Sequence, residues 1–342
     1  MTRNSFLNFK TVLLPLCLCI NIRYKHIIIS VDAAFAAFHA LTGDAIAMSA
    51  QPLETSALFT PFNASSESPR ATLLMCAPKL YDVDYVINPW MTGNVHAASR
   101  ERASAQWQQL HQALSRLAEI VFVEPQPGSP DMVFTANAGL EREGTVVLSS
   151  FFHPERQGEE PHFCRWFHAA GYTVINMPAT TRFEGEGDAL FAETSSGTCL
   201  FAGYGQRTAL ASHEILHRTW HIPVISLELI DPRFYHLDTC FAPLEGGYVM
   251  YYPQAFSPAS IAKIEVAYAP NKRIEVQETD ALRFACNAIN IGRHLILNQV
   301  SRELKAQLES LGFHTTQVDL SEFLKAGGAA KCLVMKLSPP QP

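Results

Sequence analysis

The sequence alternates between short apolar runs and longer amphipathic segments from residue 72 to residue 337, with no linker-like tract between them. Short apolar runs are typical of buried strands, and apolar residues that recur every three or four positions are typical of helices. The segment 97–120 has the second pattern and places Ala103, Trp107 and Leu110 on one face, so we expect Trp107 to pack in the core. A chain of 342 residues is long enough for about two domains, but the unbroken alternation of strands and helices favours a single α/β domain.

The predicted elements repeat in the order strand, strand, helix, strand. We expect strands over 73–77, 121–123, 132–135, 145–151, 172–177, 200–203, 223–230, 247–252, 273–276 and 294–300. Besides 97–120, helices are expected over 160–170, 208–219, 258–266, 281–288, 302–311 and 321–325. The nearest match to a glycine-rich phosphate loop, Gly185-Glu186-Gly187-Asp188, places two acids where a phosphate would sit. The pattern therefore argues against a nucleotide-binding doubly wound sheet.

Charge and cysteine usage narrow the class of protein. The formal net charge is −6 and Lys and Arg form no block, which disfavours nucleic acid because its phosphates are bound by clustered cations. A small polar substrate fits this composition better. The eight cysteines are scattered without a CxxC pair, and several lie in apolar runs, as Cys76 does. We expect free, buried thiols in a reducing, cytoplasmic compartment and no structural zinc site.

The first 70 residues form a predicted extension that precedes the domain of residues 71–342. Two basic residues precede the apolar run 12–20, as in a signal peptide, but that run is too short to span a bilayer. Basic residues also follow it directly, and no convincing cleavage site is present, which disfavours export. A start site assigned too early, with the true start near Met48, explains the segment equally well. We expect no association with a membrane.

Two polar motifs near the end of the domain suggest thiol chemistry. Cys332 follows the paired glycines Gly327 and Gly328, and His236-Leu237-Asp238 lies far upstream. A cysteine with a distant His-x-Asp suggests a nucleophile and its proton partner. Alternation along a strand would turn His236 and Asp238 to the same face. Each residue alone also fits a structural role, since a lone cysteine is usually a small buried hydrophobe. Three further polar clusters, over 87–90, 130–139 and 183–189, favour the catalytic interpretation.

A competing motif occurs in the helix predicted over 208–219. His213-Glu214-Ile215-Leu216-His217 matches H-E-x-x-H, in which two imidazoles bind zinc and the Glu acts as a base. The helix is short and is stopped by Pro223, and the glycine and third histidine of the metzincin spacing are missing. We therefore expect a solvated helix face rather than a zinc hydrolase.

The polar clusters, in this order, resemble the guanidine-modifying superfamily of arginine deiminases, dimethylarginine dimethylaminohydrolases and amidinotransferases, and in particular its bacterial arginine dihydrolase domains. The resemblance runs from about residue 73 to residue 337. It rests on the segments around Asn137 and Cys332 and on Tyr81-Asp82-Val83-Asp84-Tyr85-Val86-Ile87-Asn88-Pro89-Trp90-Met91, Glu155-Arg156-Gln157-Gly158-Glu159-Glu160 and Gly203-Tyr204-Gly205-Gln206-Arg207. It implies a pentein fold, which is a five-bladed α/β propeller with pseudo-fivefold symmetry of ββαβ units around an acidic central pocket.

The resemblance also implies roles for single residues. Cys332 would attack the guanidinium carbon of arginine, His236 would protonate the leaving amine and then activate water, and Glu184 would orient His236 and hold the guanidinium. Arg156 and Arg207 would clamp the substrate α-carboxylate, a role that suits a planar bidentate donor. The other substrate-binding residues that the resemblance implies are Asn88, Asn137, Asp188 and Asp238. No cofactor and no metal are implied, the partner is the small guanidino substrate L-arginine, and a homo-oligomer stays open.

Asn137 is a departure from the deiminase pattern. Deiminases and dimethylaminohydrolases resembling this chain place an aspartate at this position. An amide both donates and accepts hydrogen bonds, whereas a carboxylate only accepts, so a neutral ureido group becomes a tolerable ligand. We therefore predict that arginine is hydrolysed twice, to ornithine, ammonia and carbon dioxide. The alternatives are a deiminase that stops at citrulline, a dimethylarginine dimethylaminohydrolase and a non-catalytic amino-acid-binding protein.

Overall fold

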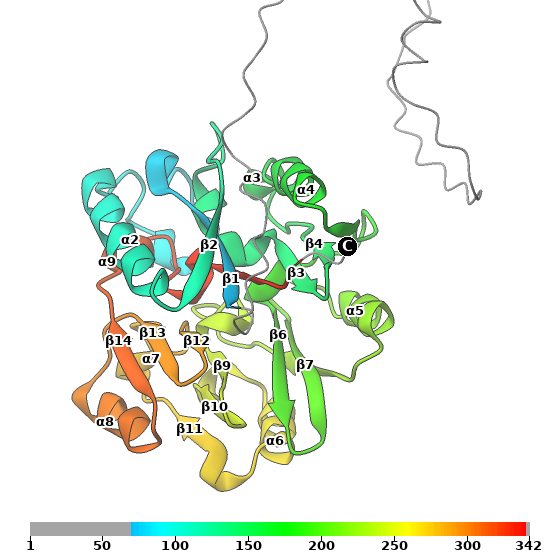
Figure 1. Ribbon diagram of the computed structural model, residues 1–342, viewed down its shortest axis with the longest axis vertical. Helices are drawn as coiled ribbons and strands as arrows, with labels where there is room; N and C mark the ends of the chain where they lie inside the picture. The colour runs from blue at the N-terminus through cyan, green and yellow to red at the C-terminus, as the bar shows by residue number, and fades with distance from the viewer. Residues whose placement is uncertain (1–69, 340–342) are drawn as a thin grey trace, which may run out of the picture. The chain divides into compact units, whose positions relative to one another are not determined.

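The strands among residues 70–339 form five separate three-stranded sheets (Figure 1). The structure is a computed structural model that describes residues 70–339, so nearly all of the extension predicted over residues 1–70 lies outside the described residues. The described elements belong to one compact unit, Ser66–Pro342. None of the helices within residues 70–339 is long and apolar enough to cross a membrane.

The elements have the following bounds. The strands are β1 (Ala71–Cys76), β2 (Ala118–Val123), β3 (Gly139–Arg142), β4 (Thr145–Leu148), β5 (Thr173–Ile175), β6 (Ala189–Thr194), β7 (Gly197–Tyr204), β8 (Val224–Glu228), β9 (Phe241–Leu244), β10 (Tyr248–Tyr251), β11 (Arg273–Glu275), β12 (Ile289–Ile291), β13 (His294–Leu297), β14 (His314–Gln317) and β15 (Met335–Leu337). The helices are α2 (Arg100–Leu114), α3 (Pro154–Gln157), α4 (Glu160–Ala169), α5 (Ser212–Trp220), α6 (Pro258–Ala267), α7 (Glu278–Ala281), α8 (Arg302–Ser310) and α9 (Ser321–Leu324).

All five sheets share one topology. The central strands β1, β4, β7, β10 and β13 each pair antiparallel with one neighbour and parallel with the other. Parallel neighbours need a crossover connection, and it contains α2, α4, α5, α6 or α8 in the five units. The first sheet is completed by β15 from the end of the chain, which pairs with β1 so that Thr72 faces Leu337. The predicted strand, strand, helix, strand repeat is thus present.

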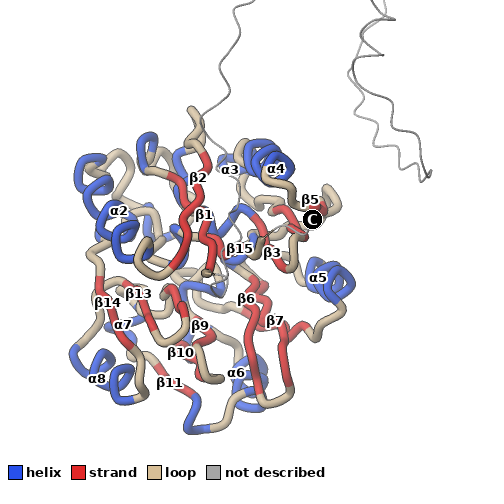
Figure 2. Tube along the Cα trace, viewed as in Figure 1, coloured by secondary structure: helices blue, strands red, loops and turns tan. Residues whose placement is uncertain are grey.

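The crossover helices α2, α4, α5, α6 and α8 lie on the outside of the molecule and the sheets lie closer to its centre (Figure 2). Helix α2 illustrates how the sequence produces this arrangement. The Ser99 hydroxyl accepts a hydrogen bond from the Arg102 backbone at 3.3 Å and caps the N-terminus of α2. Trp107, Leu110 and Leu114 are buried on its inner face, as the apolar spacing predicts.

The structure corrects two predicted elements and one predicted strand face beside the pocket described below. Residues 132–135 are not a strand, because 3₁₀ turns occupy Pro130–Val133 and Thr135–Ala138 and the strand begins at Gly139. The run was misleading because every side chain in it is buried, polar ones included. The helix over 281–288 is wrong as well, since α7 ends at Ala281. His236 and Asp238 do not share a strand face, because Leu237–Thr239 forms a 3₁₀ turn.

Candidate active site

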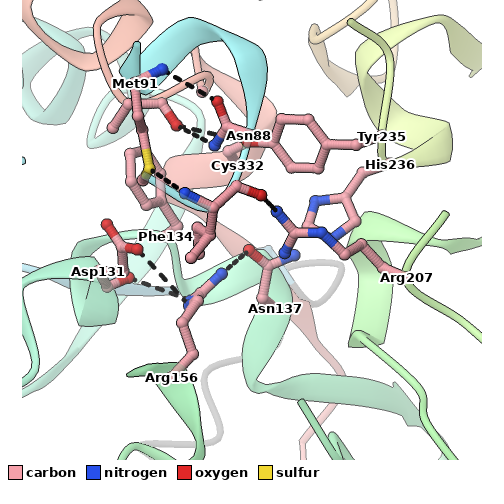
Figure 3. Close-up of a pocket in the computed structure, with 13 residues that line it drawn as sticks. Asn88, Met91, Asp131, Phe134, Asn137, Arg156, Arg207, Tyr235, His236 and Cys332 are labelled. Carbon is pink, nitrogen blue, oxygen red and sulfur yellow. Dashed lines mark hydrogen bonds and ion pairs between the residues drawn. The ribbon is translucent and has the colours of Figure 1, made fainter. Parts of the chain in front are cut away.

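A small cavity is lined by side chains from loops, 3₁₀ turns and α3 rather than from the strands (Figure 3). Six of the nine predicted site residues line it: Asn88, Asn137, Arg156, Arg207, His236 and Cys332. They come from distant parts of the sequence, so the cavity exists only because the connecting segments of different sheets converge. Of the other three, Glu184 contacts His236 and Asp238 contacts Cys332, both of which line the cavity. Asp188 contacts the backbone of Leu237, the residue after His236.

The backbone before Cys332 requires the paired glycines. Gly327 has a φ of +83°, which favours glycine, and a Cβ at position 328 would lie 2.5 Å from the ring of Phe134. The chain then enters the 3₁₀ turn Lys331–Leu333, which holds the thiol at the cavity wall with 3% of Cys332 exposed. The glycines therefore allow the close approach of Cys332 to the cavity.

The thiol of Cys332 has two polar neighbours. Its Sγ lies 3.0 Å from Nδ2 of Asn287 and 3.6 Å from Oδ2 of Asp238. Burial raises the pKa of the Cys332 thiol well above its ordinary value, and the Asp238 carboxylate adds to this effect. Burial likewise raises the pKa of Asp238, to about 7, although Lys331 opposes the change. A raised pKa favours the protonated thiol, so a positive charge or a hydrogen-bond donor beside Sγ would favour the nucleophilic thiolate.

Glu184 joins two of the cavity residues. Its Oε2 lies 2.6 Å from Nε2 of His236 and accepts a hydrogen bond from Nη1 of Arg207 at 3.3 Å, while Oε1 accepts one from the backbone of Phe152 at 3.0 Å. Burial alone would raise the pKa of Glu184, but Arg207 and His236 outweigh it and hold the pKa below its ordinary value. Glu184 is thus an ionised carboxylate that fixes the imidazole. No hydrogen bond joins His236 to Cys332 in the described part of the chain.

The two cavity arginines differ in how many of their N–H groups already donate hydrogen bonds within the protein. Arg156 donates to both oxygens of Glu159 at 2.8 and 2.9 Å, to Oδ1 of Asn137 at 2.8 Å and to the Asp131 carbonyl at 3.2 Å. Of the five N–H groups of a guanidinium, these contacts use four and leave one. Arg207 donates to Glu184 and to the Ile87 carbonyl and packs over the Tyr235 ring. Arg207 is therefore the more available donor.

Asp131 is a cavity residue that the sequence analysis did not single out. One of its oxygens, Oδ2, accepts a hydrogen bond from the Tyr85 hydroxyl at 2.9 Å, whereas the buried Oδ1 has no partner among the described residues. Burial raises the pKa of Asp131, and Arg156 opposes that change. The residue lies in the polar cluster 130–139, and an acid directly before the apolar run Met132-Val133-Phe134 was the available signal. An unpaired carboxylate oxygen suits a cationic ligand group.

Comparison with known proteins identifies the family. The family model described as N,N dimethylarginine dimethylhydrolase, eukaryotic, matches residues 84–338. The chain belongs to the N,N dimethylarginine dimethylhydrolase family. The resemblance to guanidine-modifying proteins that rested on the polar clusters is thereby confirmed.

Two relatives of this chain carry the names of two different enzymes. The bifunctional arginine dihydrolase/ornithine cyclodeaminase ArgZ of Synechocystis sp. is 54% identical over 268 residues, which are 78% of this chain and 38% of ArgZ. The chain thus spans well under half the length of that relative. The N(G),N(G)-dimethylarginine dimethylaminohydrolase of Mycobacterium tuberculosis is 40% identical over 268 residues, 78% of this chain and 85% of the relative.

A solved structure supports the fold of this family member. It is the N-terminal domain of an asparagine-to-serine variant of ArgZ, covalently bound to a reaction intermediate. It is 54% identical to this chain, covers 79% of it and 98% of the solved chain, and has a TM-score of 0.77. The α/β architecture of small sheets is therefore shared with a protein of known structure.

Asp188 was predicted to bind substrate, and the structure corrects this. Its Oδ1 accepts a hydrogen bond from the Leu237 backbone at 3.0 Å and its Oδ2 one from the Thr208 hydroxyl at 2.6 Å. It is buried and does not line the cavity. Both oxygens are needed inside the protein, where they hold the segment that carries His236.

The H-E-x-x-H motif lies on α5, away from the cavity. Both ring nitrogens of His213 are engaged, Nδ1 by the Ser226 hydroxyl at 2.8 Å and Nε2 by the Gly203 carbonyl at 3.2 Å. Burial lowers the pKa of His213 to about 4, so the ring is neutral. His217 is exposed and contacts the Ile222 carbonyl at 2.7 Å. The motif packs the helix onto β7 and β8, and only its outer residues form the solvated face that we predicted.

Proposed function

We propose that the chain is a thiol-dependent hydrolase that converts L-arginine and two waters to ornithine, two ammonia and carbon dioxide. The first water gives citrulline and one ammonia. The second gives the other ammonia and a carbamate of ornithine, which loses carbon dioxide. The 54% identity to ArgZ, whose name includes an arginine dihydrolase, supports this choice.

In each round Sγ of Cys332 forms a bond to the central carbon of the substrate and the bond from that carbon to a terminal nitrogen breaks. The guanidinium of arginine brings the positive charge that favours the thiolate in the buried cavity. His236, fixed by Glu184 at 2.6 Å, gives a proton to the departing ammonia and takes one from the water that then breaks the carbon–sulfur bond. The covalent intermediate in the related ArgZ structure supports this route.

The outer part of the cavity suits the amino-acid end of arginine. Arg207 is the donor that we assign to the α-carboxylate, together with the one N–H of Arg156 that the protein leaves free. The unpaired Oδ1 of Asp131 is assigned to the α-ammonium group. In this scheme Arg156 acts mainly through its hydrogen bond to Asn137, which orients the Asn137 amide.

The proposal extends to the domain and the location of the protein. Residues 71–342 would form one catalytic domain whose five sheets are the blades of a pseudo-fivefold propeller, which the shared topology and the grouping of the sheets around one centre support (Figure 1). The six described cysteines are unpaired, which supports a reducing, cytoplasmic compartment. L-Arginine is the only partner that the reaction requires besides water.

The observation that carries the second hydrolytic step is the amide of Asn137 in the cavity wall. Purified protein incubated with L-arginine should release ornithine and ammonia in a ratio of one to two. Accumulation of citrulline alone would replace the proposal by a deiminase. Activity that survives a chelator would separate the reaction from a zinc hydrolase.

A second candidate is a dimethylarginine dimethylaminohydrolase, which the matching family model and the Mycobacterium tuberculosis relative favour. Incubation with asymmetric dimethylarginine distinguishes it, because that activity would release dimethylamine and citrulline. If no guanidino compound reacts, an amino-acid-binding role replaces both, and calorimetry with L-arginine tests it.

A further inference from the structure

Asn287 contacts the candidate nucleophile at two atoms. Its Nδ2 lies 3.0 Å from Sγ of Cys332, and its Oδ1 accepts a hydrogen bond from the Cys332 backbone at 3.1 Å. The same Nδ2 donates to the Asp238 carbonyl at 3.2 Å. Asn287 is completely buried, so no water competes for these bonds. One carboxamide therefore holds both the main chain and the thiol of Cys332.

The backbone leading to Asn287 is in an unusual conformation. The helix predicted over 281–288 stops at Ala281, and Phe284 follows with a φ of +55°, a left-handed value that bulky residues rarely adopt. The Asn287 backbone then donates to the Phe284 carbonyl at 3.0 Å, and the Lys331 backbone donates to the Asn287 carbonyl at 3.2 Å. Such strain persists only where surrounding contacts hold it, and it is enriched at functional sites. Here it ends the helix and presents Asn287 to Cys332.

The surroundings of the thiol explain why a donor is needed. Burial and the Asp238 carboxylate at 3.6 Å both oppose a negative charge on Sγ. Three neighbours favour the charged sulfur, namely the backbone of Ala329, the side-chain amide of Asn287 at 3.0 Å and the charge of Lys331, and Asn287 is the only one of the three that donates from a side chain. A hydrogen bond to a charged sulfur is stronger than one to a neutral thiol, so this contact favours the thiolate.

We propose that Asn287 is a positioning residue that holds Cys332 for attack and stabilises its thiolate through the Nδ2 hydrogen bond. This inference rests on the proposed function, because it takes Cys332 as the nucleophile. It also specifies the chemistry of the side chain, since only an amide of this length supplies both the donor for Sγ and the acceptor for the Cys332 backbone.

The test measures the thiol directly and needs no substrate. The rate of Cys332 alkylation by iodoacetamide is followed against pH by peptide mass spectrometry in the wild type, Asn287→Ala and Asn287→Asp. Asn287→Ala should lower the alkylation rate of Cys332 about tenfold at any fixed pH below the thiol pKa, which is the loss of thiolate that a pKa higher by about one unit produces. Asn287→Asp keeps the shape but replaces the donor by a carboxylate, so its shift should be larger. Half-buried Cys164 is an internal reference whose profile stays unchanged.

Asn298→Ala is the matched control. Asn298 is also buried and also donates to one carbonyl, of Arg283, while accepting from the Leu320 backbone, but it does not contact Cys332. An unchanged Cys332 profile in both Asn287 variants, or an equal shift in Asn298→Ala, would overturn the inference. The near-isosteric Asn287→Asp keeps the test decisive if Asn287→Ala does not fold.

Turnover of L-arginine on the same samples separates this inference from the proposed function. An active wild type whose variants lose kcat with little change in KM, together with the shifted profile, supports both. A wild type inert toward arginine whose variants still show the shift removes the proposed function and keeps the assignment of Asn287 to the thiol. An active wild type with no shift in the variants removes the assignment alone.

Discussion

Nη1 of Arg156 donates a 2.8 Å hydrogen bond to Oδ1 of Asn137 in the cavity wall. The bond fixes the orientation of the amide, because the oxygen faces the guanidinium and Nδ2 faces the Glu184 carbonyl at 3.3 Å. A carboxylate at this position would still pair with Arg156 but would lose the Nδ2 donor. The loss of this donor should affect the second substrate, citrulline, whose ureido group carries a carbonyl and no charge.

We expect Asn137→Asp to change the product rather than to abolish turnover. The added negative charge favours the cationic guanidinium over the neutral ureido group, so citrulline should become the main product. Amino-acid analysis after complete consumption of arginine measures the ratio of citrulline to ornithine. A variant that still makes ornithine and ammonia at one to two would remove the explanation based on Asn137.

Cys332→Ser should lower kcat for arginine by at least about a thousandfold, because a hydroxyl is far less nucleophilic than a thiolate. Arginine binding, measured by calorimetry, should persist. The control is Cys164→Ser, since Cys164 lies outside the cavity and its replacement should leave the rate within about twofold. Substantial turnover by Cys332→Ser would transfer the nucleophile to another group.

Glu184→Gln should lower kcat/KM by about a hundredfold or more, because the carboxylate holds both His236 and Arg207. The amide can still accept the Phe152 backbone hydrogen bond, so the loss reports the charge. Glu160→Gln is the matched control, since Glu160 likewise accepts a backbone hydrogen bond, from Phe151 at 2.8 Å, whereas no described hydrogen bond joins it to His236 or Arg207. Equal losses in the two variants would mean that Glu184 acts only through the fold.

Asp131→Asn should raise KM for arginine by about tenfold or more, because Oδ1 loses the charge assigned to the α-ammonium group. The test compares arginine with 5-guanidinopentanoate, which is arginine without its α-amino group. Turnover of the analogue should be slow in the wild type and similar in the variant. If the variant loses as much on the analogue as on arginine, Asp131 does not contact the amino group.

Asp238→Asn should become relatively more stable as the pH rises. The pKa of Asp238 is about 7 in the folded protein and near 4 in the unfolded chain, so stability from the neutral carboxyl is complete below pH 4 and lost by pH 7. The asparagine lacks this dependence. The difference in unfolding free energy between the variant and the wild type should grow by up to about 4 kcal/mol between pH 4 and 7 and then level off. Urea unfolding at several pH values measures it, and a constant difference would contradict a raised pKa.

Parts of the site were predictable from local sequence and parts were not. The paired glycines before Cys332 and the acids near Gly185 stood out because they interrupt apolar runs. Asn287 did not, because it lies in a segment whose apolar residues suggested a helix, and Asp131 was not selected although it lies in the polar cluster 130–139. Asp188 was selected for its polarity, yet both of its oxygens are used to hold the Leu237 backbone and Thr208. A polar residue in an apolar segment indicates that its side chain has a hydrogen-bond partner, but it does not indicate which residue or ligand that partner is.

The sequence by itself determined the alternation of apolar strands and amphipathic helices, the single α/β unit and the order of motifs that indicates the family. These features depend on periodicity and on residue types that neighbours along the chain reveal. Only the tertiary structure decided that Glu184 also holds Arg207, that Arg156 is already paired with Glu159, and that Asn287 meets Cys332. The contacts of Glu184 and Asn287 join segments of different sheets, and their distances depend on how the sheets pack, which no local pattern records.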